Sequence, residues 1–263
     1  MTPAAPNGHP APLIMIDGLR KFVGRLARDR PECSASSEFM NVGVAVTGAL
    51  PLSSAAVQVS ATRKDSPAVV HLADCRWHRV VEGRSFPVLE DETSYHFSVD
   101  DVGARVQCVL KNRNGESDSV LFGPIELDGE VRSFAQRALA ENDALFSVNV
   151  VGAERPCALR ISAGNASLKL EQRSVDWDTA AVESRCTPLD PNLAIVDFSQ
   201  CADSPLRGAE QFTDLAELRL KFISPLQRDK FVLLARLFAQ MKSFPVKKAL
   251  FELEKTEKSA NFP

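Results

Sequence analysis

The sequence predicts a mainly β protein with flanking helices, built as two β domains in succession. Short segments of alternating apolar and polar residues fill 40–127 and return in 143–243. Leu218, Leu220 and Phe222 then alternate with charged residues, as in a half-buried strand, and a thick amphipathic helix follows. These observations predict a sandwich followed by a small barrel that its last helix closes.

The closing helix is predicted to begin at Ser224-Pro225. Ser224 can accept a hydrogen bond from a backbone N–H that the first turn leaves unpaired, and Pro225 has no such N–H to lose. A wide apolar stripe follows at helical spacing, so we expect more than half of the circumference to be buried. Its members are Phe231, Leu234, Ala235, Phe238 and Met241, with Val232, Leu233 and Leu237 beside them. Asp229, Arg236 and Gln240 are expected on the far, solvent-facing side.

The composition is that of an ordinary globular protein. The 263 residues are 44% hydrophobic and 25% charged, which suits one or two domains. A net charge of −3 gives no field of one sign for binding nucleic acid or an anionic membrane. No apolar run approaches the roughly 20 residues that span a bilayer, and no signal peptide is recognised. We therefore expect a cytoplasmic protein.

The cysteines have neither a CxxC pair nor the spacing of zinc ligands. We expect all of them to be reduced and most to be buried, with Cys75 and Cys108 unbonded. They are Cys33, Cys75, Cys108, Cys157, Cys186 and Cys201.

The first β segment, 40–127, has short strands that Gly, Pro, Asp and Asn turns separate at regular intervals. This length and texture are typical of an immunoglobulin-like sandwich. Trp77 stands on a strand where such a sandwich has a core tryptophan. Cys75 is only two residues away, so the usual disulfide between the sheets is not expected.

The block from Cys75 to Glu116 has a Trp followed by basic residues, an aromatic strand that runs into Asp-Asp-Val-Gly at 100–103, and a strand with a Gly turn. In these features it resembles the repeated immunoglobulin-like module of the auxin-induced-in-root-cultures family of microtubule-associated proteins. That family occurs in plants and some flagellated protists. The resemblance implies a pleckstrin-homology-like domain after the module, with Phe231 or Phe238 in place of its core tryptophan.

The expected organisation follows from these patterns and this resemblance. It consists of a disordered segment 1–12, an amphipathic helix 13–30, an immunoglobulin-like sandwich 40–127, a helical connector 128–142, a pleckstrin-homology-like domain 143–243 and a charged tail 244–263. The helix 13–30 has basic residues around an apolar stripe and leaves two interpretations open. It can pack on the sandwich, or it can contact a partner or a surface.

A basic hairpin in the second domain is the strongest candidate site. A two-residue primed turn at Gly164-Asn165 would pair Leu159 with Leu170 on the core face. The same register would place Arg160 directly opposite Lys169 on the outer face, where like charges repel.

In phosphoinositide-binding pleckstrin-homology domains, basic residues on this hairpin clamp phosphates. The usual order, a Lys at the end of the first strand and a basic-x-Arg in the second, is absent from this sequence, and Glu154 and Glu171 stand nearby. The sequence therefore favours a solvated sheet face, which long basic side chains usually occupy, and an anion clamp is the alternative. The candidate anion or partner surface consists of Arg155, Arg160, Lys169 and Arg173.

No enzymatic site is predicted. The histidines form no HExxH motif, and the chain has neither a GxSxG elbow nor a phosphate-binding glycine loop. Asp100-Asp101 and Glu90-Asp91-Glu92 are acidic enough to consider for a cation, but adjacent residues point apart, which favours loop capping or solvation. We expect no catalytic residue, cofactor or metal.

These expectations together favour a non-enzymatic scaffold or adaptor associated with the cytoskeleton. The resemblance implies that tubulin or microtubule-associated proteins are the partners, in the cytoplasm or in a microtubule-based structure such as a flagellum. The alternative function is a peripheral membrane adaptor that binds phosphoinositide through its second domain.

Overall fold

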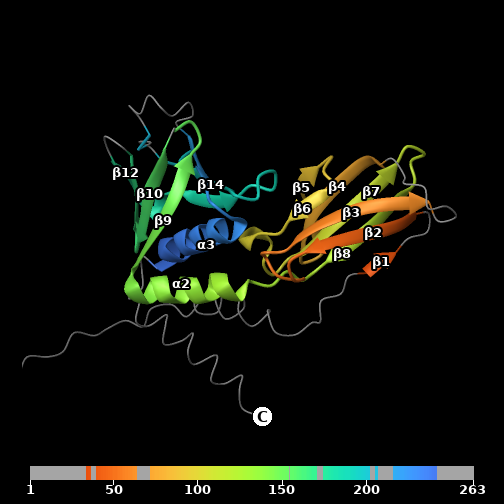
Figure 1. Cartoon of the computed structure of the whole chain (residues 1–263), viewed down its shortest axis with the longest axis horizontal. Helices are drawn as coiled ribbons and strands as arrows, with labels where there is room; N and C mark the ends of the chain where they lie inside the picture. The colour runs from red at the N-terminus through yellow and green to blue at the C-terminus, as the bar shows by residue number, and fades with distance from the viewer. Residues whose placement is uncertain are drawn as a thin grey trace, which may run out of the picture.

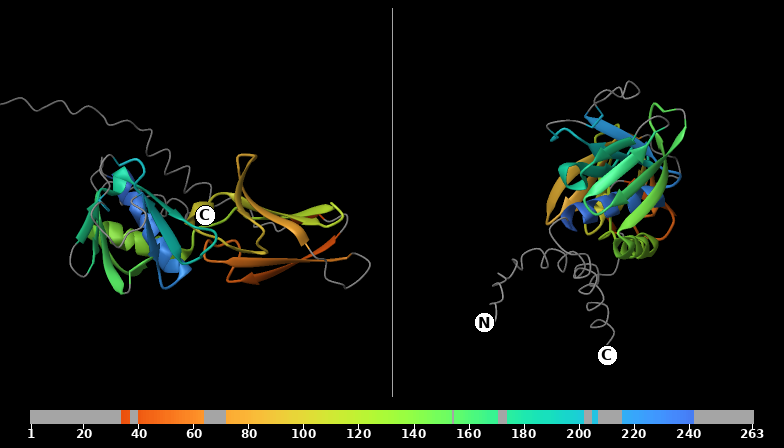
Figure 2. Two further views of the ribbon diagram at one scale, coloured as in Figure 1. Left: turned by 90° about the horizontal axis from the view of Figure 1, so that it is seen from above. Right: turned by 90° about the vertical axis from the view of Figure 1, so that its left-hand side faces the viewer.

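The computed structural model describes residues 34–36, 40–63, 72–153, 155–170, 174–201, 205–206 and 216–241. Over these residues the protein is mainly β, with antiparallel sheets and two α-helices (Figure 1). The strands form two groups along the long axis of the molecule, and the helices accompany the second group (Figures 1 and 2). The predicted mainly β class is confirmed.

The first group consists of two sheets that share one hydrophobic core. The five-stranded sheet has the order β1 (Ser34–Ser36), β8 (Ser117–Phe122), β7 (Arg105–Asn112), β4 (Leu72–Val81) and β5 (Arg84–Glu90). The three-stranded sheet has the order β2 (Met40–Thr47), β3 (Ala56–Arg63) and β6 (Ser94–His96).

Trp77 lies at the centre of this first core and is fully buried. Its ring stacks on that of Tyr95 at 5.0 Å between centroids, and its Nε1 donates to the carbonyl of Glu92 at 2.7 Å. Because Trp77 comes from the five-stranded sheet and Tyr95 from the three-stranded one, this contact joins the two layers. Cys75 and Cys108 lie nearby as free thiols, with their sulfurs 3.5 Å apart.

The second group is one seven-stranded antiparallel sheet. Its order is β12 (Ser174–Trp177), β11 (Asn165–Lys169), β10 (Pro156–Ser162), β9 (Asp143–Val150), β15 (Glu217–Lys221), β14 (Leu193–Asp197) and β13 (Glu183–Cys186). Two short 3-10 turns, η2 (Val99–Asp101) and η3 (Thr179–Ala181), interrupt the strands of the chain.

The helix α2 (Gly129–Glu141) connects the two groups of strands and corresponds to the predicted connector. The side chain of Asp128 accepts a hydrogen bond from the backbone N–H of Glu130 at 2.8 Å and so caps the first turn. At the other end Asn142 adopts a left-handed conformation, with φ at 56°, and closes the helix.

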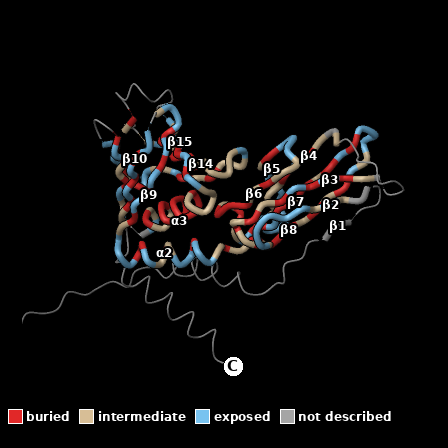
Figure 3. The backbone as a smooth tube through the Cα atoms, viewed as in Figure 1, coloured by how far each residue is buried: buried red, intermediate tan, exposed pale blue. Residues whose placement is uncertain are grey.

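The helix α3 (Pro225–Met241) contributes its apolar side chains to the core of the second group. Ser224 accepts a hydrogen bond from the backbone N–H of Gln227 at 3.3 Å, in agreement with the predicted cap. Phe231 and Phe238 are fully buried, and the tube in Figure 3 is red along most of the helix. Phe231 stacks on Phe222 with ring centroids 5.3 Å apart.

The seven-stranded sheet does not close into the predicted barrel. Among the described strands, β12 and β13 each pair with a single neighbour. The turn η3 separates them in the chain, and α3 packs against both η3 and β13. Side chains of α3, and not backbone pairing, therefore cover this side of the core.

The predicted hairpin register is also wrong, by two residues. Ser162 pairs with Asn165, so the turn is Ala163-Gly164 and not Gly164-Asn165. Gly164 has a φ of 79°, whereas Ala163 does not have a positive φ, as a primed turn would require. The position of this single glycine sets the turn, and Leu159 consequently pairs with Leu168.

Several predicted segments lie outside the described residues. These are the segment 1–12, the helix 13–30 and the tail 244–263. Within the part of the chain that the structure describes, no helix is long and apolar enough to cross a membrane.

Candidate functional site

The predicted basic surface is not assembled as expected. Arg160 pairs with Ser167 across the hairpin, and Lys169 pairs with Ala158, so the two basic residues are not directly opposite. Arg160 forms two hydrogen bonds with Asp143, one from Nε at 2.7 Å and one from Nη2 at 3.1 Å. Its guanidinium therefore already has a carboxylate partner.

The other described residues of this surface do not complete an anion-binding site. Lys169 and Arg155 are exposed, and Arg155 precedes the first residue of β10. Arg173 lies outside the described residues, as do Glu154 and Glu171. An anion that approached this hairpin would meet a neutralised guanidinium instead of a convergent set of donors.

A network of polar side chains, most of them buried, connects the two groups of strands and is called the joint below. Its members are Arg79, Asp100, Asp101, Arg228, Asp229 and Arg236. Asp101 is fully buried in the first group. Its Oδ1 accepts hydrogen bonds from Arg79 Nε at 2.9 Å, from Arg79 Nη2 at 2.7 Å and from the Tyr95 hydroxyl at 3.0 Å. Its Oδ2 accepts from the backbone N–H and the hydroxyl of Ser98. Burial raises the pKa of Asp101, and the positive charge of Arg79 opposes that shift.

Asp100 points in the opposite direction, into the second group. Its Oδ2 accepts a hydrogen bond from the backbone N–H of Cys186 at 2.9 Å. Nη2 of Arg236 lies 2.5 Å from Oδ1 of Asp100. Two adjacent carboxylates are thus held by different groups of strands. The expectation that Asp100 and Asp101 point apart agrees with this geometry.

Arg228 and Asp229, at the start of α3, form the centre of the joint. The side chain of each is 1% exposed. Arg228 donates to Oδ1 of Asp229 from Nε at 2.9 Å and from Nη2 at 2.7 Å. Nη2 also donates to the carbonyl of Phe97, in the first group, at 3.4 Å. Burial raises the pKa of Asp229 to about 6, and Arg228 opposes that shift.

The predicted outward orientation of Asp229 and Arg236 is therefore wrong. Asp229 is buried, and Arg236 is half-buried, with its Nε donating to the carbonyl of Ser184 at 2.9 Å. The reason is that α3 is covered on two sides, by its own sheet and by η2 of the first group. The helical spacing of apolar residues identifies the side of α3 that packs on its own sheet. It cannot identify the second covered side, because the residues there are charged and form ion pairs.

Two polar contacts of the α2 region support the joint. The hydroxyl of Ser54 donates to Asp128 Oδ2 at 2.5 Å, which links the first group to the helix cap. Lys230 of α3 pairs with Glu130 of α2, and its Nζ lies 5.4 Å from the centre of the Phe134 ring. The connector is thus bonded to both groups.

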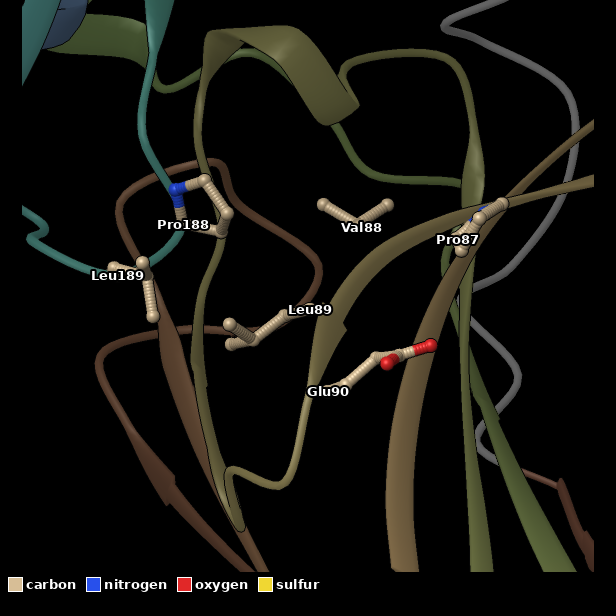
Figure 4. Close-up of a pocket in the computed structure, with 6 residues that line it drawn as sticks. All are labelled: Pro87, Val88, Leu89, Glu90, Pro188 and Leu189. Atoms are coloured by element: carbon tan, nitrogen blue, oxygen red, sulfur yellow. The ribbon is translucent and has the colours of Figure 1, made fainter.

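A small apolar groove lies beside the joint, with walls from both groups. One wall is Pro188-Leu189, in the connection that follows β13, and the other is Pro87 to Glu90 of β5 (Figure 4). The hollow has a volume of about 330 Å³. Leu189 is 73% exposed, so an apolar side chain is presented to solvent at its rim. Sequence patterns did not indicate the groove, because its walls are about 100 residues apart in the chain.

The described residues contain few groups that could bind a metal or act in catalysis. Among the described residues, no three His, Cys, Asp or Glu side chains are grouped as metal ligands. His78 and His96 lie on β4 and β6 of the first group, and His9 and His71 are outside the described residues. Burial lowers the pKa of His96, so its neutral form is favoured.

Comparisons with known proteins do not assign the chain to a family. No protein-family model matches it, and no curated protein matches it significantly.

Proposed function

We propose that the protein is a non-enzymatic, cytoskeleton-associated scaffold or adaptor with two binding domains. The domains are an immunoglobulin-like sandwich at 40–127 and a pleckstrin-homology-like domain at 143–243, joined by the connector 128–142. The observation that carries the proposal is the buried joint. It holds two β domains in one orientation, and a fixed orientation lowers the entropic cost of binding a partner that contacts both.

The strand orders support the proposed domain types. In the first domain, two antiparallel sheets enclose Trp77, and this supports an immunoglobulin-like sandwich. In the second, a four-stranded meander and a three-stranded meander meet between β9 and β15, and a C-terminal helix packs on them. Because a fold alone does not assign a function, the choice of binding rests on the joint and on the groove.

The groove between β5 and Leu189 is the surface that we propose for docking. Its walls belong to different domains, so the joint determines their separation. A partner that fits is an apolar segment with a basic residue near it, because Glu90 is exposed at the rim. The assignment to tubulin or microtubule-associated proteins rests on the family resemblance of the block from Cys75 to Glu116.

The membrane alternative has less support. A phosphoinositide clamp needs several free basic donors that converge on one phosphate group. In the hairpin, Arg160 is bonded to Asp143, and Lys169 faces Ala158. We therefore expect localisation that does not depend on this hairpin.

Detergent extraction of cells that express the tagged chain tests the proposal. We expect the wild-type protein to stay in the cytoskeletal pellet. The Leu189→Asp variant should move to the supernatant, because a carboxylate would be placed in the apolar groove. Ile223→Asp is the matched control, since Ile223 is 87% exposed and is not among the lining residues. It should stay in the pellet.

Other outcomes would contradict the proposal. Release of the wild-type protein by detergent would favour a lipid-held adaptor, and so would binding to phosphoinositide vesicles. A further variant should then lose vesicle binding, because it lacks the charges of the hairpin. That variant replaces Arg155, Arg160, Lys169 and Arg173 by Gln. Equal release of Leu189→Asp and Ile223→Asp would exclude the groove as the docking surface.

A further inference from the structure

The strands at the ends of the three sheets differ in how they are protected against pairing with another chain. A free edge presents unpaired N–H and C=O groups, and proteins usually block it with short strands, charges, proline or a bulge. The described edge strands are β1 and β5, β2 and β6, and β12 and β13.

All of these edges but one carry such protection. β1 and β6 have three residues each. β12 and β13 have four residues each and carry charges, Asp176 in β12 and Glu183 and Arg185 in β13. β5 contains Pro87 and Glu90, and its pairing with β4 is interrupted by a register shift.

The exception is β2, which has the sequence MNVGVAVT over Met40–Thr47. It is eight residues long and contains neither a charged residue nor a proline. Its register with β3 is continuous from Met40↔Arg63 to Thr47↔Ala56, so no bulge turns it away. Among the described residues, no strand pairs with its other side.

The backbone groups on that free side can be assigned. The N–H of Val59 donates to the carbonyl of Thr93 on the β6 side of β3, and the carbonyl of Ala55 accepts from Phe97 on the same side. In an antiparallel strand the backbone groups of alternate residues point to alternate sides. The even-numbered residues of β3 therefore face β2, among them Gln58 opposite Ala45.

It follows that Gly43, Ala45 and Thr47 use their backbone groups to pair with β3. The N–H and C=O of Val42, Val44 and Val46 then point out of the sheet. These three valines also share one side-chain face, the one directed toward the core, where Val42 and Val44 pack. Val46 is 44% exposed at the edge of that face.

We propose that β2 pairs antiparallel with β2 of a second copy of this chain, so that two three-stranded sheets become one six-stranded sheet. A two-fold axis at Val44 would place Val44 opposite Val44 of the second copy. Val42 of each copy would lie opposite Val46 of the other. The outward N–H and C=O groups of both strands would then bond to each other, and each exposed Val46 would be covered by a valine.

The charge pattern of β2 favours a second copy over a different partner. In an antiparallel self-pairing about Val44, a charged residue at the axis would lie opposite its own copy, and like charges that are directly opposite repel. β2 carries no charge, so its self-pairing has no such penalty, and nothing on it selects a charged partner. One paired strand makes a small interface, and we therefore expect a weak dimer that dissociates on dilution.

Sedimentation equilibrium of the full chain at increasing concentration tests the proposal, with two substitutions at one position. Val44→Pro removes an outward N–H and leaves the bonds to β3 in place, and an edge strand tolerates this change. Val44→Ala shortens the side chain and keeps the N–H. We expect the dissociation constant to rise at least tenfold for Val44→Pro and less than threefold for Val44→Ala.

Two further measurements keep the outcome decisive. Gln58→Lys places a charge on the outer face of the sheet, one strand in from the edge, and should leave the dimer intact. Dimerisation should also change little between low and high salt, because no charges pair across the edge. If Val44→Pro fails to fold by circular dichroism, Val42→Pro removes another outward N–H and replaces it. A wild-type chain that stays monomeric, or a folded proline variant that dimerises as the wild type does, would overturn the proposal.

Discussion

Two arginine–aspartate pairs in this protein have similar geometry and opposite surroundings. In each, the guanidinium donates two hydrogen bonds to one aspartate. The side chains of Arg228 and Asp229 are each 1% exposed, whereas those of Arg160 and Asp143 are 66% and 39% exposed. Burial makes an ion pair costly to break, while exposure leaves it screened by water and salt.

The difference separates structural charges from surface charges in this chain. The buried pair lies where α3 meets the first group of strands, so its loss should weaken the contact between the two groups. The exposed pair only neutralises one basic residue of the hairpin. Arg160, which was predicted to bind an anion, therefore belongs to an exposed pair. Asp229, which was predicted to face solvent, belongs to the buried pair that stabilises the contact between the two groups of strands.

The largest effect is expected for Asp229→Ala. This change leaves the Arg228 guanidinium buried without its carboxylate, so the free energy of unfolding should fall by about 3–5 kcal/mol. Urea denaturation at neutral pH measures it. Adding Arg228→Met should recover part of the loss, because the unpaired charge is then removed. A loss below about 1 kcal/mol for Asp229→Ala would mean that water reaches the joint.

The pH dependence of the same pair is the next largest effect. Burial raises the pKa of Asp229 to about 6 from the usual 3.8, so the folded state binds this proton more tightly than the unfolded state. The contribution of Asp229 to stability is then fullest below about pH 4, and it declines by up to about 3 kcal/mol as the pH rises through 6.

Asp229→Asn provides the reference for that measurement, because it cannot titrate. The stability of the wild-type protein relative to this variant should decrease between pH 4 and pH 7. An increase over the same range would show that attraction to Arg228 outweighs burial, and that the pKa of Asp229 lies below its usual value.

Arg236→Ala should have an intermediate effect. Arg236 is paired with Asp100 and donates to the carbonyl of Ser184, but 35% of its side chain is exposed. Solvent screens part of the interaction, so the expected loss in the free energy of unfolding is about 1–2 kcal/mol. A change below about 0.5 kcal/mol, typical of an outer helix face, would restore the orientation predicted from the sequence.

The core of α3 could be predicted from the sequence, whereas its polar side could not. Phe231 and Phe238 are buried as their spacing indicated. The spacing of Arg228 and Asp229 is equally consistent with a solvated face, because nothing within the helix shows that η2 of the first group packs on it. The only sequence signal was Asp100-Asp101 in a turn, and it did not identify its partners.

The hairpin shows a different limit of sequence reasoning. The sequence predicts a turn at Gly164-Asn165, one residue later than the turn in the structure. The predicted pairing of the two strands is therefore shifted by two residues. A slip of two keeps every side chain on the same face, so Leu159, Ile161 and Leu168 are buried as predicted. Cross-strand neighbours are not preserved by such a slip, and the supposed Arg160–Lys169 repulsion was therefore wrong.

The smallest change in the free energy of unfolding is expected when the exposed pair, Arg160 and Asp143, is broken. Asp143→Ala frees the Arg160 guanidinium, but water can solvate it at once, so the urea midpoint should not change within measurement error. The substitution also raises the positive charge of the hairpin. If the freed Arg160 and the exposed Lys169 then bind phosphoinositide vesicles that the wild-type protein ignores, Asp143 is what keeps this surface from acting as an anion clamp. If the variant remains without affinity, the register itself, with Lys169 opposite Ala158, is what prevents a clamp from forming.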